Sequence, residues 1–155
     1  NATCNIDSKG LVFLGEVVEQ DGGFASCRFP YLEPPLNLSK FKGFQFEILG
    51  EGRTLKAAIA CSDKSFGITK FFLGSLRWVA AIPTSEKGIT SIKIPFNSLK
   101  PAVRAKKINL PIGFNSSSVT RIQLLYSKFG LPGELNEDFK PGPINIFLRS
   151  ISAYS

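Results

Sequence analysis

Short segments of alternating apolar and polar residues, separated by glycine or proline, are the feature that most limits how this chain can fold. Two glycines at 22–23 are followed by alternation along residues 24–29. Residues 44–49 and 55–61 alternate in the same way, and the glycine-containing turn 50–53 lies between them. A period of two residues is typical of β-strands with one buried face. We therefore predict a strand at 24–29 and a β-hairpin formed by 44–49 and 55–61.

Similar segments recur along most of the chain. They are residues 11–18, 71–73, 78–82, 89–94, 119–126 and 144–154. Residues 96–111 and 128–143 contain proline and charged residues and are expected to be connections, and residues 36–41 form one turn that Asn37 or Ser39 can cap. No 3.6-residue period is long enough for a substantial helix. About eight short strands with regular turns indicate an all-β fold, an antiparallel β-sandwich or jelly roll.

The length of the chain fits one folded unit. The 155 residues are expected to form a single β-sandwich domain, 1–155, with a core of useful size. Because the first residue is Asn1 and not Met, we expect this domain to be excised from a longer chain. No apolar run approaches the roughly 20 residues that span a bilayer, and residues 1–10 do not resemble a signal peptide.

The three cysteines, Cys4, Cys27 and Cys61, are scattered along the chain. Their number is odd and no pair has C-x-x-C spacing, so a disulfide framework is not expected. Cys27 and Cys61 lie on strand patterns and are predicted to be small buried apolar residues. This use of cysteine favours a reducing compartment.

Residue types that carry common catalytic chemistry are absent or dispersed. The chain contains no histidine, which excludes a Ser-His-Asp or Cys-His nucleophile and histidine metal ligands. The carboxylates form no close pair in the sequence, and the G-x-G match at 50–52 fits a turn better than a dinucleotide loop. We therefore predict that the protein is not an enzyme and that it holds no cofactor or metal.

Positive charge is concentrated in the second half of the chain. The net charge is +7, and residues 87–133 carry eight cations and no acid, whereas residues 1–51 carry seven acids and four bases. This asymmetry predicts an anionic partner, which could be RNA, an acidic protein face or a lipid surface. The candidate binding residues are Lys100, Arg104, Lys106, Lys107, Arg121 and Lys128. The alternative is a solvated surface without a partner.

Trp78 is the one tryptophan and has two interpretations. If exposed on a sandwich, its ring could stack on a sugar or a base. Its neighbours Leu76 and Val79 are apolar, which favours a position in the core.

Several short motifs, taken in order, resemble the complex I intermediate-associated protein 30 family over roughly residues 11–154. They are Gly22-Gly23-Phe24-Ala25-Ser26 with Arg28, Leu38-Ser39 with Phe41 and Gly43, the segment 50–53, Ile94-Pro95-Phe96, Gly142-Pro143 and Ile151-Ser152-Ala153-Tyr154. Two positions depart from the family pattern: Ile89 stands where an aromatic residue is common, and Asn37 where Asp is common. The resemblance implies a galactose-binding-like jelly roll.

The resemblance also implies a function. Family members look like non-enzymatic assembly factors, and the mitochondrial ones assist biogenesis of respiratory complex I. Plant and cyanobacterial members carry a similar domain joined to an NmrA-like atypical short-chain dehydrogenase domain, and one resembles a translation factor for a photosystem II subunit. Residues 122–129 look more like this photosynthetic branch.

Together these observations predict a chaperone-like binding or scaffold module of a biogenesis factor for photosystem II or complex I. Its partners would be subunits or assembly intermediates of a membrane complex, with peripheral membrane association and no transmembrane segment. Two alternatives stay open: an RNA-binding module acting in translation, and a carbohydrate-binding module. The photosynthetic resemblance implies the chloroplast stroma or thylakoid surface, or the cyanobacterial cytoplasm; the mitochondrial matrix is the alternative location.

Overall fold

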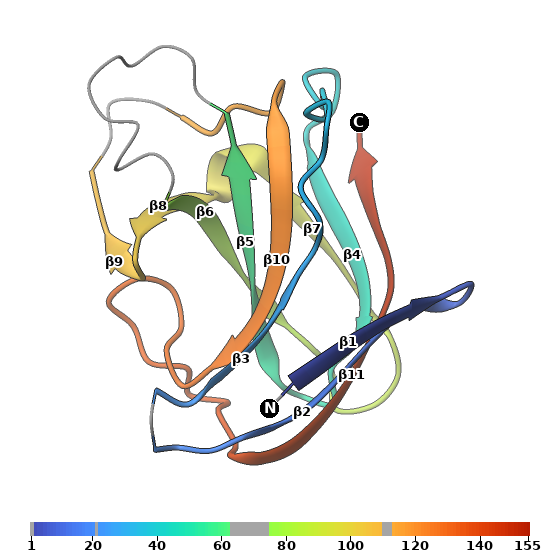
Figure 1. Ribbon diagram of the computed structural model, residues 1–155, viewed down its shortest axis with the longest axis vertical. Coiled ribbons are helices and arrows are strands. Elements are labelled where there is room, and N and C mark those ends of the chain that lie inside the picture. Colours follow the sequence, from blue (N-terminus) through green and yellow to red (C-terminus); the bar gives the residue numbers. More distant parts are fainter. Residues whose placement is uncertain (1, 21, 63–74, 110–112) are drawn as a thin grey trace.

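The structure, a computed structural model, consists of two antiparallel β-sheets packed against each other (Figure 1). It describes residues 2–20, 22–62, 75–109 and 113–155. Apart from one 3-10 turn, η1 (Phe96–Ser98), all regular elements of the described residues are strands. The predicted all-β sandwich is therefore confirmed.

The first sheet has five strands in the order β1-β2-β11-β4-β7. Their bounds are β1 (Ala2–Asp7), β2 (Gly10–Val17), β11 (Gly142–Tyr154), β4 (Gly43–Leu49) and β7 (Thr90–Pro95). All the pairings are antiparallel.

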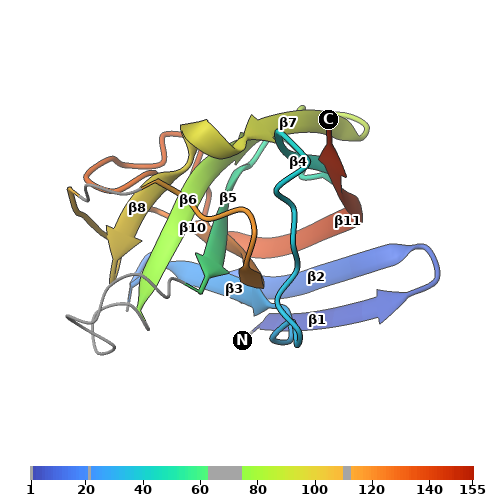
Figure 2. The same cartoon turned by 90° about the horizontal axis from the view of Figure 1, so that it is seen from above.

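The second sheet has six strands in the order β3-β10-β5-β6-β8-β9. Their bounds are β3 (Phe24–Arg28), β10 (Val119–Ser127), β5 (Thr54–Cys61), β6 (Leu76–Pro83), β8 (Lys100–Val103) and β9 (Lys106–Lys107). Seen from above, β5, β6 and β8 lie on one side of the sandwich and β4, β7 and β11 on the other (Figure 2).

The core lies between the two sheets and is built from alternate residues of the strands. Along β5, Leu55, Ala57 and Ile59 are buried in this core, and β4 contributes Phe44 and Phe46 from the opposite sheet. Burying such apolar surface is the main favourable term in folding. The same alternation places the intervening residues of β5 on the outer face of the six-stranded sheet.

Most of the predicted strands and turns are confirmed. The expected segments 11–18, 24–29, 78–82, 89–94, 119–126 and 144–154 correspond to β2, β3, β6, β7, β10 and β11. Gly22 and Gly23 both have positive φ, +97° and +53°, which glycine adopts without strain. Asn37 accepts a hydrogen bond from the backbone N–H of Ser39 at 3.0 Å and so caps the short turn as expected. The predicted strand 71–73 lies outside the described residues.

The predicted hairpin of residues 44–49 and 55–61 is wrong. Both strands exist, as β4 and β5, but β4 pairs with β7 and β11 whereas β5 pairs with β6 and β10. The turn between them is held in part by the N–H of Arg53, which donates to the carbonyl of Gly50 at 3.1 Å. It therefore carries the chain from one sheet to the other. A tight turn brings two strands close, but longer-range pairing determines which sheet each strand joins.

Three strands were not predicted from the sequence. β1 pairs only with β2, at the edge of its sheet, and all six of its residues are exposed. β8 and β9 form a hairpin within residues 96–111, which the sequence analysis interpreted as a connection. Pro101 and the run of cations hide the strand pattern there, because both are uncommon in strand interiors.

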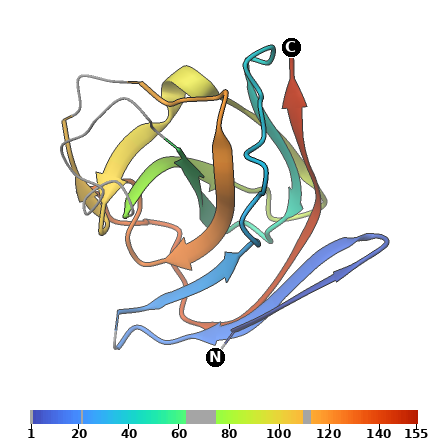
Figure 3. The ribbon, with the colours of Figure 1, turned by 45° about the horizontal axis from the view of Figure 1, so that its top comes forward.

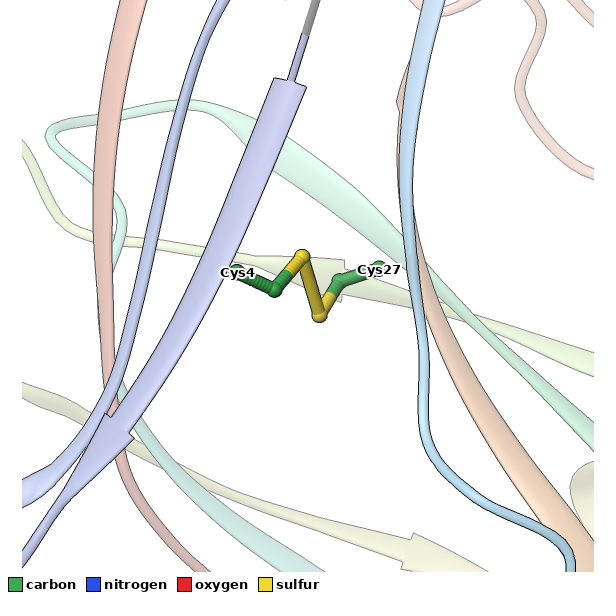
Figure 4. The surroundings of a disulfide bond; sticks show 2 residues. All are labelled: Cys4 and Cys27. Carbon is green, nitrogen blue, oxygen red and sulfur yellow. A yellow bond between two sulfur atoms is a disulfide. The ribbon is translucent and has the colours of Figure 1, made fainter.

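The expectation that the chain lacks disulfides is also wrong. Cys4 on β1 and Cys27 on β3 form a disulfide bond, with their Cα atoms 6.0 Å apart (Figure 4). Cys27 is buried as predicted, and Cys61 is partly buried. Because β1 and β3 are the edge strands of different sheets, this bond links the two sheets along one side of the sandwich. The cysteine-based argument for a reducing compartment therefore does not hold.

Replacing Cys4 by Ala is expected to lower the free energy of unfolding by about 3 kcal/mol, because the bond closes a loop across a sequence separation of 23 residues. Denaturant unfolding with and without a thiol reductant measures this effect. The reductant should destabilise the wild-type protein to the level of the variant and leave the variant unchanged. A wild-type midpoint that does not respond to the reductant would contradict the assignment.

Candidate anion-binding face

The outer face of the six-stranded sheet is lined by cations. Directly paired residues of neighbouring strands point to the same side, and Lys100, Val79, Ala58, Gln123 and Arg28 form one such row across the sheet. The cations on this side are Arg28, Lys56, Arg77, Lys100, Lys107 and Arg121, which we call the basic face. The described strands of this sheet contain no aspartate or glutamate.

A small apolar patch lies in the middle of the basic face. Ala58, Val79 and Ala102 are buried there although they point away from the main core. Leu131, from the loop 128–141, packs on this patch together with Leu125. The loop therefore covers part of the outer face, and it runs beside the β8–β9 hairpin (Figure 3).

Lys56 holds the start of this loop. Its Nζ donates hydrogen bonds to the carbonyl of Gly130 at 2.9 Å and to that of Phe129 at 3.4 Å. Burial under the loop lowers the pKa of Lys56, because the charged form loses solvation. This cation is therefore committed to the loop and is less accessible to an external anion than the other lysines of the face.

Asn136 and Tyr126 hold the rest of the loop. The Asn136 Nδ2 donates to the carbonyls of Thr54 and Ser127, both at 2.9 Å, and its Oδ1 accepts from the N–H of Asp138. The hydroxyl of Tyr126 accepts a hydrogen bond from the N–H of Lys140 at 2.7 Å. These contacts fix the position of the segment on the sheet. The sequence alone predicts only a long loop there.

Two neighbouring hollows share Leu131 and Pro132 in their linings. The first has a volume of about 410 Å³; it is lined by Val79, Ala102, Arg104, Lys106, Phe129 and Leu135, among other residues. The second, of about 370 Å³, is lined by Lys100, Lys107, Ile108 and Asn109 on the side of the hairpin. Glu134 lines both hollows and is the one acid among their described lining residues.

The structure brings together four of the six predicted anion-binding residues. Lys100, Arg104, Lys106 and Lys107 all lie on the hairpin β8–β9 and its turn, which we call the basic hairpin, and all four are exposed.

The other two predicted residues lie outside the basic hairpin and have partners within the chain. The Arg121 Nε donates to the carbonyl of Phe29 at 2.8 Å, and its guanidinium lies 4.3 Å from the centroid of the Tyr31 ring. The Lys128 Nζ donates to the carbonyl of Glu19 at 3.3 Å. Both side chains thus have structural contacts that an anionic partner would have to share or displace.

Trp78 lies in the core, in agreement with the second interpretation of its sequence context. Trp78 is only 4% exposed, and its ring packs edge-on against that of Phe114, with 6.0 Å between the ring centroids. Its Nε1 has no hydrogen-bond partner among the described residues. A ring buried between the sheets has no exposed face on which a sugar or base could stack, so the stacking role is corrected.

Three residues of the basic face were missed by the sequence analysis: Arg28, Lys56 and Arg77. Each lies on a separate strand, and the chain brings them together only through the pairing of β3, β10, β5 and β6. The sequence does indicate, through the alternation of apolar and polar residues in each strand, that these three cations lie on the polar side of their strands. Alternation within one strand does not indicate which strands are neighbours.

Other kinds of site find little support among the described residues. No group of three or more cysteines, aspartates and glutamates there has the geometry to hold a metal ion. The described part also contains no helix whose length and hydrophobicity would allow it to cross a bilayer.

Replacing Asn136 by Ala is expected to loosen the loop over the basic face. The change removes two hydrogen bonds to backbone carbonyls and should cost about 2 kcal/mol of unfolding free energy. Hydrogen exchange should become faster in residues 128–141 and stay unchanged in β2 and β11. The Glu137→Ala variant is the control, because Glu137 is exposed and adjacent. Equal exchange rates in both variants would contradict the anchoring role.

Comparison with known proteins agrees with this architecture. In solved structures the fold recurs in the "Family 11 Carbohydrate-Binding Module of cellulosomal cellulase Lic26A-Cel5E of Clostridium thermocellum", with a TM-score of 0.66, 17% identity and coverage of 100% of this chain and 82% of that one. It also recurs in a family 30 carbohydrate-binding module, with a TM-score of 0.58, 13% identity and coverage of 98% and 83%. At these identities the likeness shows the fold alone.

Sequence comparison identifies the family. No curated protein matches the sequence of this chain. The sequence profile of the complex I intermediate-associated protein 30 family matches residues 1–148. That match covers nearly the whole chain, and it agrees with the ordered motifs and with the jelly-roll fold. The chain therefore belongs to the complex I intermediate-associated protein 30 family.

Proposed function

We propose that this chain is a non-catalytic binding and scaffold module of an assembly factor for a membrane-bound electron-transfer complex. The observation that carries this proposal is the family match over residues 1–148, since the family is described by its association with complex I intermediates. Respiratory complex I is the first candidate. Photosystem II is the second, because residues 122–129 resemble the photosynthetic branch of the family.

The chemistry of the surface supports a binding role over a catalytic one. The chain has no histidine, and among the described residues the two groups with a shifted pKa have structural explanations. The pKa of Glu47 is lowered by its hydrogen bonds with Arg149 and Ser150, and that of Lys56 by burial under the loop. Their described partners, Arg149 and Ser150 for Glu47 and two backbone carbonyls for Lys56, do not form a general acid–base pair.

The location follows from the partner. For complex I the module would work in the mitochondrial matrix, and for photosystem II in the chloroplast stroma or the cyanobacterial cytoplasm, at the thylakoid surface. In each case it would associate with the membrane through subunits of the complex.

RNA binding is the second candidate function, and the basic face is the observation that favours it. Phosphate contacts need only a surface rich in lysine and arginine, and the described strands of this sheet have no acid. Single-stranded RNA is usually held also by aromatic rings that stack on its bases. Trp78 is buried, and the described lining of the hollows contains one aromatic ring, that of Phe129.

Carbohydrate binding has weaker support. The solved structures that share the fold include a module "in complex with beta-1,3-1,4-mixed-linked tetrasaccharide", with a TM-score of 0.65 and 18% identity. Sugar rings stack on exposed aromatic faces. The middle of the basic face instead presents alanine, valine and leucine.

Co-purification of the full-length protein with its native membranes tests the proposed function. We expect subunits or assembly intermediates of complex I or photosystem II to be recovered, and the identity of those subunits decides between the two complexes. Recovery of soluble metabolic enzymes alone would contradict the proposal.

Reversing the four charges of the basic hairpin tests RNA binding. If RNA is the ligand, the affinity for single-stranded RNA in a gel shift should fall steeply with salt, with a logarithmic slope of about −0.7 for each neutralised phosphate. The variant with Glu at positions 100, 104, 106 and 107 should lose that binding. An unchanged gel shift in this variant would show that RNA does not bind at the basic hairpin.

A further inference from the structure

The basic hairpin carries positive charge that no described residue pairs with. None of the four cations Lys100, Arg104, Lys106 and Lys107 forms an ion pair or donates a side-chain hydrogen bond to another described residue. Arg53 and Arg149, in contrast, pair with Glu51 and Glu47. Four like charges within eight residues repel one another, so an anionic partner would relieve an unfavourable arrangement.

The turn of the basic hairpin adds an independent observation. Arg104 and Ala105 both have positive φ, 49° and 64°. Two-residue hairpin turns of this kind favour Asn-Gly, because residues with a Cβ atom are strained in that conformation. Backbone strain of this sort is concentrated at ligand-binding sites. The turn projects Arg104 and Lys106 along the rim of the first hollow.

Apolar side chains surround the same hollows. The first is lined by Val79 and Ala102, which are buried, and Leu131 packs on them and lines both hollows. Phe129 and Leu135 pair through an isolated β-bridge at the rim of the first hollow, and Leu135 is 72% exposed. A ligand that fits this site would carry both negative charge and apolar groups.

The edge of the sheet favours an extended chain as that ligand. Among the described strands, β9 is the last of its sheet, so no described strand pairs with one of its backbone edges. Lysines on an edge strand discourage pairing between two copies of this basic protein, whereas an acidic strand meets favourable cross-strand charge pairs there. Peptides recognised by strand addition are bound in this way, with backbone hydrogen bonds and alternate side chains in pockets.

We propose that the basic hairpin and the two hollows beside it bind an extended acidic segment of a partner protein, with carboxylates at the hairpin cations and apolar side chains in the hollows. This inference rests on the proposed function, which supplies a protein partner. Protein is favoured over RNA here because the described residues that line the hollows are largely aliphatic and include a single aromatic ring.

The probe for this site is a fluorescent peptide in which glutamate and leucine alternate, with a lysine–leucine peptide of equal length as the charge-reversed probe. We expect the acidic peptide to raise the fluorescence anisotropy in a salt-dependent manner and the basic peptide to give no signal. The variant R104Q/K106Q/K107Q should bind the acidic peptide at least about tenfold more weakly. The control K40Q/K42Q/K87Q removes three exposed lysines elsewhere and should lose less than about threefold.

Two further matched pairs separate the apolar contribution from the electrostatic one. Leu135→Gln should weaken binding about threefold, whereas Ile6→Gln, at a residue with the same 72% exposure on β1, should have no effect. Glu134→Gln should strengthen binding about twofold, since it removes a like charge at the rim of both hollows, and Glu86→Gln should not. Circular dichroism and thermal melts confirm that each variant is folded.

Several outcomes would overturn the inference. Equal losses of affinity for the acidic peptide in the hairpin variant and in the lysine control would mean that the peptide is attracted by the overall positive charge and not by this site. Hairpin-dependent binding of single-stranded RNA or of anionic vesicles, without binding of the acidic peptide, would assign the site to that ligand instead. If native subunits co-purify equally well with R104Q/K106Q/K107Q, the proposed function stands and this site is wrong. If the peptide binds but no membrane-complex subunit co-purifies, the site stands and the proposed function is wrong.

Discussion

The register in which β5 pairs with β6 and β10 is the constraint on which the rest of this structure depends. It directs Leu55, Ala57 and Ile59 into the core and leaves Lys56 on the outer face. A shift by one residue would bring Lys56 into the core and expose three apolar residues, which is costly on both counts. The same register extends through β6 to β8 and there fixes Lys100 on the outer face. Core packing and the position of the cations therefore have a common cause.

Strong alternation of apolar and polar residues correctly predicts where strands lie. It does not predict which strands pair when the partners are far apart in the sequence. β4 and β5 each show a clear period of two residues, and both exist. Their assignment to different sheets depends on β7, β11, β6 and β10, which contact them from distant parts of the chain. β1 was missed for a related reason, because its position depends on its pairing with β2 and on the bond from Cys4 to Cys27. Spacing alone does not show which cysteines meet.

The candidate site was predictable to the extent that its residues are close in sequence. Lys100, Arg104, Lys106 and Lys107 were recognisable as a cluster because they lie within eight residues, although their hairpin was not. The loop that covers the apolar patch could not be placed. Its position depends on hydrogen bonds from Lys56 and Asn136, two polar side chains whose partners are backbone carbonyls, and such contacts leave no pattern in the sequence.

Shared architecture does not decide what this chain binds, because one fold serves many functions and binding depends on the side chains of the site. Contacts with β6 hold the basic hairpin in place. β8 pairs with β6 across four residue pairs, and Ala102 is buried against Val79. Without this support, four neighbouring cations and a strained turn at Arg104 and Ala105 would favour an open conformation. The sheet thus stabilises a charged loop that would not be stable alone. Such preorganisation lowers the entropy cost of binding, since a partner meets cations whose backbone is already fixed.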